Sequence, residues 1–141
     1  MVCGVNICLV TDSRVRALYK IDPQPEAPAE ARRIIAEELS SRLSAEVLDD
    51  IKLMVSELVT NGVVHGAGPA DGPVILDLCV NGDICCRVLN QGSAFAAGPK
   101  PRPKATWPGG WGLELVEQLS DRWGMERTSH RTEVWFERRR A

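Results

Sequence analysis

The stretch EVLDDIKLMVSELVTNGVVHG, residues 46–66, constrains the fold more than any other part of this chain. Its apolar residues recur close to the 3.6-residue period of an α-helix, which predicts one long helix with a buried stripe. Ser44 can cap the N-terminus of this helix. Because residues four apart lie one above the other on a helix, Glu57, Asn61 and His65 line up along another side. We therefore expect a core helix that also lines a functional site.

Composition narrows the class of protein. The chain has 141 residues, which is enough for one domain with its own core but too few for two ordinary domains. Its net charge of −2 argues against a nucleic-acid binder, which would need a basic face to neutralise phosphates. No apolar run is long enough to span a membrane, and the first residues lack the basic region of a signal peptide. We therefore expect a cytoplasmic protein.

The five cysteines are odd in number, and no C-x-x-C spacing occurs among them. A disulfide framework or a metal site would require cysteines in pairs or clusters. We therefore expect these residues to be reduced and to behave as small apolar side chains.

Periodicity in the rest of the chain predicts both strands and helices. Alternating apolar residues predict five strands, the first of them at a sheet edge, at 15–21, 74–80, 84–90, 123–128 and 132–138. Asn81-Gly82 is a strong signal for a hairpin turn. Two further helices are expected at about 28–43, packed antiparallel to the long helix, and at 110–121. Helices on one face of a mostly antiparallel sheet make a two-layer α+β sandwich.

Two segments lie outside these elements. Residues 1–12 include an alternating apolar pattern and are expected to form an N-terminal arm or an extra strand, ahead of a single domain at 13–141. Residues 91–109 are rich in glycine, proline and basic residues. A loop of this length inside a domain is usually either a lid over a functional site or a disordered segment, and we expect a lid at 91–109.

Glycine-rich turns flank the predicted lid. Residues 109–113, GGWGL, open the helix that follows the lid, and residues 89–95, LNQGSAF, end the strand that precedes it. Glycines at the start of a helix let free backbone N–H groups approach an anion, which the helix dipole also attracts. With Glu57 and Asn61 on the long helix, this arrangement suits a nucleotide with its phosphates under the lid and a metal beside the helix.

These segments together resemble the motifs of the GHKL ATPases. Residues 57–66, ELVTNGVVHG, resemble their N-box, and the likeness is closest to the small bacterial anti-sigma-factor serine kinases and related regulatory ATPases. Residues 110–116, GWGLELV, resemble their second glycine box, and 120–124 and 132–137 resemble the end of the domain. The match covers roughly residues 15–138 in the same order, and it implies a histidine-kinase-like ATPase fold with about three helices on one face of the sheet.

The resemblance also implies a role for each matching residue. Glu57 would be the general base that deprotonates a serine on a protein substrate, and Asn61 would bind Mg²⁺ through its side-chain oxygen. Backbone amides at Gly110 and Gly112 would meet the phosphates, and Thr132 would help to hold the adenine. The residues that the resemblance places at bound ATP are Asn61, His65, Asn90, Gly92, Gly110, Trp111, Gly112, Leu113 and Thr132.

The first glycine box departs from the family pattern at two positions. Asn90 stands where the family has an aspartate that accepts a hydrogen bond from the adenine amino group, and Ala94 replaces a glycine. An amide oxygen can accept the same bond, but hydrogen bonds to a charged group are roughly twice as strong.

Three functions follow as hypotheses. The first is an ATP-dependent serine kinase that phosphorylates an anti-sigma-factor antagonist and also sequesters a sigma factor, with a homodimer as one form of assembly. The second is a protein-interaction module of the same fold with impaired nucleotide binding, which Asn90 favours. The third is the ATPase domain of a histidine kinase, which the lack of a preceding phosphoacceptor-histidine helix pair disfavours.

Overall fold

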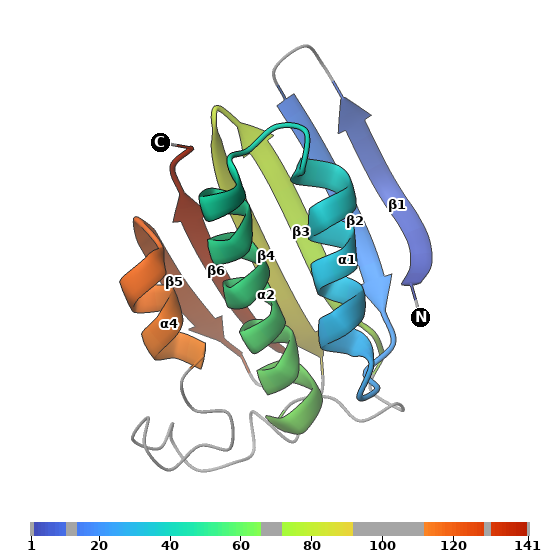
Figure 1. Ribbon diagram of the computed structural model, residues 1–141. Coiled ribbons are helices and arrows are strands. Elements are labelled where there is room, and N and C mark those ends of the chain that lie inside the picture. Colours follow the sequence, from blue (N-terminus) through green and yellow to red (C-terminus); the bar gives the residue numbers. More distant parts are fainter. Residues whose placement is uncertain (1, 11–13, 66–71, 92–111, 129–130, 141) are drawn as a thin grey trace.

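The protein is built as one antiparallel sheet with helices on one face (Figure 1). The computed structural model describes residues 2–10, 14–65, 72–91, 112–128 and 131–140. The strands are β1 (Val2–Val10), β2 (Arg14–Ile21), β3 (Val74–Asn81), β4 (Asp83–Gln91), β5 (Arg122–Arg127) and β6 (Arg131–Arg138). The helices are α1 (Ala27–Leu39), α2 (Ala45–His65) and α4 (Gly112–Leu119). The predicted two-layer α+β sandwich is confirmed.

The strand order in the sheet is β1-β2-β3-β4-β6-β5, and every neighbouring pair is antiparallel. The hairpin predicted at Asn81-Gly82 joins β3 to β4, and Gly82 has a φ of 80°, which glycine adopts without strain. The hairpin predicted at the C-terminal end joins β5 to β6. Because β6 returns between β4 and β5, it occupies an interior position in the sheet.

The prediction that residues 15–21 form an edge strand is wrong. Residues 2–10, for which either a strand or an arm was expected, form β1 and pair along the outer side of β2. β2 therefore has neighbours on both sides. An alternating pattern reports which face of a strand is buried, but it does not report whether a second strand covers its edge.

The long helix α2 begins and ends where its periodicity predicts. The Ser44 hydroxyl accepts a hydrogen bond from the backbone N–H of Val47 at 3.3 Å, which confirms the expected cap. α1 ends at Leu39, four residues earlier than predicted, because residues 40–43 form a tight turn that leads into α2. α2 contacts α1 on one side, α4 on the other, and the strands β3, β4 and β6 beneath it (Figure 1).

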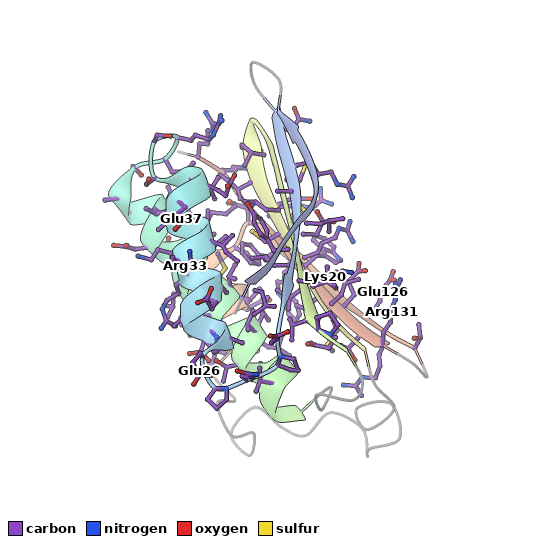
Figure 2. All side chains as sticks on the ribbon, turned by 90° about the vertical axis from the view of Figure 1, so that its right-hand side faces the viewer. Lys20, Glu26, Arg33, Glu37, Glu126 and Arg131 are labelled. Atoms are coloured by element: carbon purple, nitrogen blue, oxygen red, sulfur yellow. The ribbon has the colours of Figure 1, made fainter. Side chains whose placement is uncertain are left out.

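The core lies between the helices and one face of the sheet. It is formed by the buried stripe of α2 together with every second residue of β3, β4 and β6, as the alternating patterns predict. The opposite face of the sheet carries charged side chains, and Figure 2 shows Lys20, Glu126 and Arg131 pointing away from the helices. Ion pairs on that face join Arg16 to Asp77 at 3.2 Å and Arg87 to Glu133.

Candidate functional site

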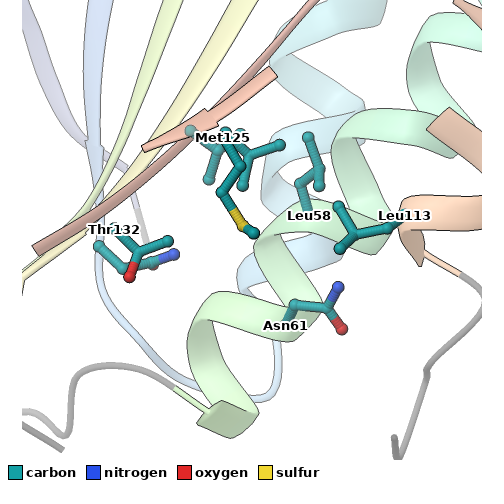
Figure 3. A pocket seen from close by; sticks show the side chains of 8 residues that line it. Leu58, Asn61, Leu113, Met125 and Thr132 are labelled. Atoms are coloured by element: carbon teal, nitrogen blue, oxygen red, sulfur yellow. The ribbon is translucent and has the colours of Figure 1, made fainter. Parts of the chain in front are cut away.

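A pocket opens between α2, α4 and the strands β4, β6 and β5 (Figure 3). The enclosed part of the pocket is small, about 20 Å³, and the pocket is partly open to solvent. Residues from all five elements line it, namely Leu58, Asn61, Val88, Asn90, Leu113, Met125, Thr132 and Val134. The polar side chains in this set are two carboxamides and one hydroxyl, and none of the lining residues carries a charge.

Asn61 reaches the pocket because of its place on α2. It lies three residues after Leu58, so that both residues are on the same side of the helix, and both line the pocket (Figure 3). Asn61 is 8% exposed and its Oδ1 is buried without a hydrogen-bond partner. Its neighbour Thr60 is satisfied within the helix, since its hydroxyl donates to the carbonyl of Ser56 at 2.7 Å.

The register of the sheet places Asn90 and Thr132 next to each other. They are directly opposite each other on β4 and β6, and both side chains point to the helix side. Asn90 is 6% exposed and Thr132 is 3% exposed. The Oδ1 of Asn90 and the Oγ1 of Thr132 are also buried without a hydrogen-bond partner. A sheet thus brings together two polar residues that lie far apart in the sequence.

The carboxamide of Asn90 lies directly against α2 at Gly62. A Cβ atom placed at Gly62 would come within 2.1 Å of Oδ1 and 2.7 Å of both Cγ and Nδ2 of Asn90. This distance is far inside van der Waals contact, so a larger residue at position 62 would displace the carboxamide from its present position. The carboxamide of Asn90 is therefore in close contact with α2 at Gly62.

Three buried oxygens without partners in one pocket indicate a ligand site. Burying a polar group without a hydrogen bond is costly, and native proteins satisfy most such groups. Here Asn61, Asn90 and Thr132 all line the pocket, and each has a buried side-chain oxygen without a hydrogen-bond partner. The remaining walls are apolar, formed by aliphatic side chains and Met125 (Figure 3). Such a pocket suits a flat, largely apolar group with a few hydrogen-bonding atoms at its edge.

The structure groups four of the residues expected at ATP, since Asn61, Asn90, Leu113 and Thr132 all line this pocket. Gly112 is the first residue of α4. His65 is the last residue of α2, but its side chain lies outside the described part of the structure, as do Gly92, Gly110, Trp111, Ala94 and the predicted lid.

Glu57 lies on α2 one turn before Asn61, is half-buried, and does not belong to the lining of the pocket. Its role as a base therefore stays a prediction.

Sequence reasoning missed the apolar walls of the pocket. Val88 and Val134 lie two residues from Asn90 and Thr132 on the same strands, so strand alternation places each pair on one face. This signal was available once Asn90 and Thr132 were singled out. Met125 is different, because its place in the pocket depends on the pairing of β5 with β6.

The fold and the pocket define a class of protein. Residues 21–138 match the family described as histidine kinase-like ATPase domain, and the chain belongs to that family. Among solved structures, the chain is similar to the crystal structure of the RsbU and RsbW domains of Rv1364c from Mycobacterium tuberculosis, with a TM-score of 0.69 and 20% sequence identity. That match covers 88% of this chain and 32% of the other, so this chain spans about a third of the solved one.

A search of curated proteins and the lengths of the helices give two further findings. No curated protein matches the sequence significantly. In the described part of the chain, no helix is both long enough and apolar enough to cross a membrane.

Proposed function

We propose that this chain is an ATP-dependent regulatory protein that phosphorylates a serine of an anti-sigma-factor antagonist, sequesters a sigma factor, or does both. One observation carries the proposal: three residues that line one pocket of a histidine kinase-like ATPase domain each have a buried oxygen without a hydrogen-bond partner. The similarity to a structure that contains an RsbW domain supports the choice of a regulatory ATPase.

The sheet side of the pocket, formed by β4 and β6, is suited to the nucleotide base. Asn90 and Thr132 lie opposite each other there and offer hydrogen-bonding atoms that have no other partner. The aliphatic walls would pack on the faces of the ring, and Leu113 at the start of α4 would cover one of them. We assign adenine to this side because both the polar edge and the apolar walls fit a purine.

The helix side of the pocket, formed by α2 and α4, is suited to the phosphates. The unpartnered Oδ1 of Asn61 is an oxygen ligand of the kind that Mg²⁺ prefers. The N-terminus of α4 at Gly112 would attract phosphate through its free N–H groups. Bound ATP would supply the phosphoryl group for transfer, and Glu57 would accept the proton of the substrate hydroxyl. His65, Gly92, Gly110 and Trp111 complete the proposed site at the ATP phosphates and lid.

The same proposal covers organisation and partners. We place the domain at residues 13–141 in the cytoplasm, with a lid at about 91–109 and with a sigma factor and an antagonist as protein partners. A homodimer is one form of assembly that the proposal includes. A second function, a protein-interaction module of this fold that binds nucleotide poorly, is favoured by Asn90, because a carboxamide lacks the charge of an aspartate.

Calorimetric titration with Mg·ATP and Mg·ADP separates these two functions. We expect heat of binding from the native chain, and stronger binding from Asn90→Asp, because its carboxylate strengthens the bond to the adenine amino group. Asn81→Asp, at the exposed hairpin turn, is the matched control for the change in charge. Binding that appears only in Asn90→Asp would support the interaction module and contradict the kinase.

Phosphate transfer to a cognate antagonist tests the role of Glu57. We expect Glu57→Gln to abolish transfer while nucleotide binding and the circular dichroism spectrum are retained. Glu46→Gln, in the exposed first turn of the same helix, is the control and should transfer normally. If Glu57→Gln still transfers phosphate, Glu57 is not the general base.

A further inference from the structure

We propose that the pocket accepts 6-oxopurine nucleotides as well as 6-aminopurine nucleotides, and that Asn90 is the residue that permits both. The inference rests on the proposed nucleotide-binding function and concerns which base the pocket reads. Its starting point is that a carboxamide, with one acceptor and one donor group, occupies the buried end of the pocket.

Nothing in the described surroundings of Asn90 fixes which end of its amide faces the ligand. Its Oδ1 has no hydrogen-bond partner, and its closest neighbour on α2 is Gly62, which offers no side chain. Both Oδ1 and Nδ2 lie close to the position that a Cβ atom at Gly62 would take. Since the two ends of a carboxamide have nearly the same shape, packing against glycine accommodates either orientation.

The two orientations match the edges of two classes of purine. Adenine presents a 6-amino donor beside the N1 acceptor, whereas a 6-oxopurine presents an O6 acceptor beside an N1–H donor. A carboxamide meets the first edge with its oxygen toward the 6-position and the second with its nitrogen there. A carboxylate only accepts, so it would leave O6 without a donor.

Thr132 does not supply the discrimination between adenine and 6-oxopurines that Asn90 lacks. Its hydroxyl, directly opposite Asn90 in the sheet, can rotate to donate or to accept. Thr132 Oγ1 has no hydrogen-bond partner to hold it in one state. The rest of the pocket lining is apolar except for Asn61, and none of it is charged. Both polar groups opposite each other in the sheet thus adapt to the edge that a purine presents.

The test is calorimetric titration of the native chain with Mg·ATP and with Mg·ITP, which differ only at the 6-position and its adjacent N1. We expect the two dissociation constants to agree within about tenfold, because neither base leaves a buried group unpaired. In Asn90→Asp the ratio should move by about tenfold or more in favour of ATP, since O6 then faces an acceptor. Asn81→Asp should leave the ratio unchanged. Asn90→Ala, which removes both amide groups, should weaken the two nucleotides by similar factors.

Several results would overturn the proposal. A native chain that binds ATP about a hundredfold more tightly than ITP would refute it while leaving the proposed ATP function intact. An unchanged ratio in folded Asn90→Asp, or an Asn90→Ala variant that loses affinity for ATP alone, would also refute it. A folded native chain that binds neither nucleotide would instead remove the proposed function and this inference with it.

Discussion

The contact between Gly62 and Asn90 gives the sharpest test of how the pocket is built. Substituting Gly62→Ala places a methyl group 2.1 Å from the Oδ1 of Asn90, so the carboxamide must move. Alanine favours the helix by up to about 1 kcal/mol relative to glycine. Forcing extra volume into a packed interior typically costs about 1–3 kcal/mol. The two effects oppose each other, and the net change in the free energy of unfolding should lie between about zero and a loss of about 2 kcal/mol.

The informative quantity is the coupling between the two positions. In an Asn90→Ala background the colliding atoms are gone, so Gly62→Ala should stabilise the protein by up to about 1 kcal/mol. The difference between the two backgrounds is then about 1–3 kcal/mol, equal to the cost of the collision. Urea unfolding of the native chain, both single variants and the double variant, followed by circular dichroism, measures this difference.

Additive effects of Gly62→Ala and Asn90→Ala on the free energy of unfolding would refute the proposed contact. If Gly62→Ala changes the free energy of unfolding by the same amount in both backgrounds, within about 0.5 kcal/mol, the residues do not interact as the structure shows. A second readout is the side-chain amide resonance of Asn90. Its chemical shift should change in Gly62→Ala, because the carboxamide leaves the surface of α2, and an unchanged shift would contradict the close contact.

Two further predictions concern the rest of the fold. Asp50→Asn should lower the free energy of unfolding by about 1–3 kcal/mol in urea titrations, because Asp50 Oδ2 accepts a hydrogen bond from Arg138 at 3.0 Å in a pair that is only 25% and 15% exposed. The exposed Asp49→Asn should change it by less than about 0.5 kcal/mol, and equal effects would contradict a specific role for the pair. Burial raises the pKa of the Cys86 thiol well above its ordinary value of 9.0, so the folded state keeps this proton where the unfolded state loses it. The free energy of unfolding should therefore fall as pH rises above 9.0, and this fall should be shallower in Cys86→Ala; an identical pH dependence would show that the thiol does not contribute.

Much of the candidate site was predictable from sequence patterns. The four-residue spacing placed Asn61 correctly on α2, and Asn61, Asn90, Leu113 and Thr132 are four predicted residues that share one pocket. Of the cysteines whose burial the structure describes, Cys86 is fully buried, as expected for a small apolar side chain, whereas Cys79 and Cys85 are half-buried. The lid and its flanking glycines stay predictions, because residues 92–111 lie outside the described structure.

The sequence alone determined the elements, because their signals are local. A buried stripe repeats every 3.6 residues in α2, alternation marks β3, β4 and β6, and Gly82 marks a turn, so each can be read within a short window. Tertiary structure alone decided which elements are neighbours, since strand pairing depends on contacts between segments far apart in the chain. It covered the edge of β2 with β1, set Asn90 opposite Thr132, and brought Asn90 against Gly62. The pocket exists because these long-range pairings bring its lining residues together, which no local pattern specifies.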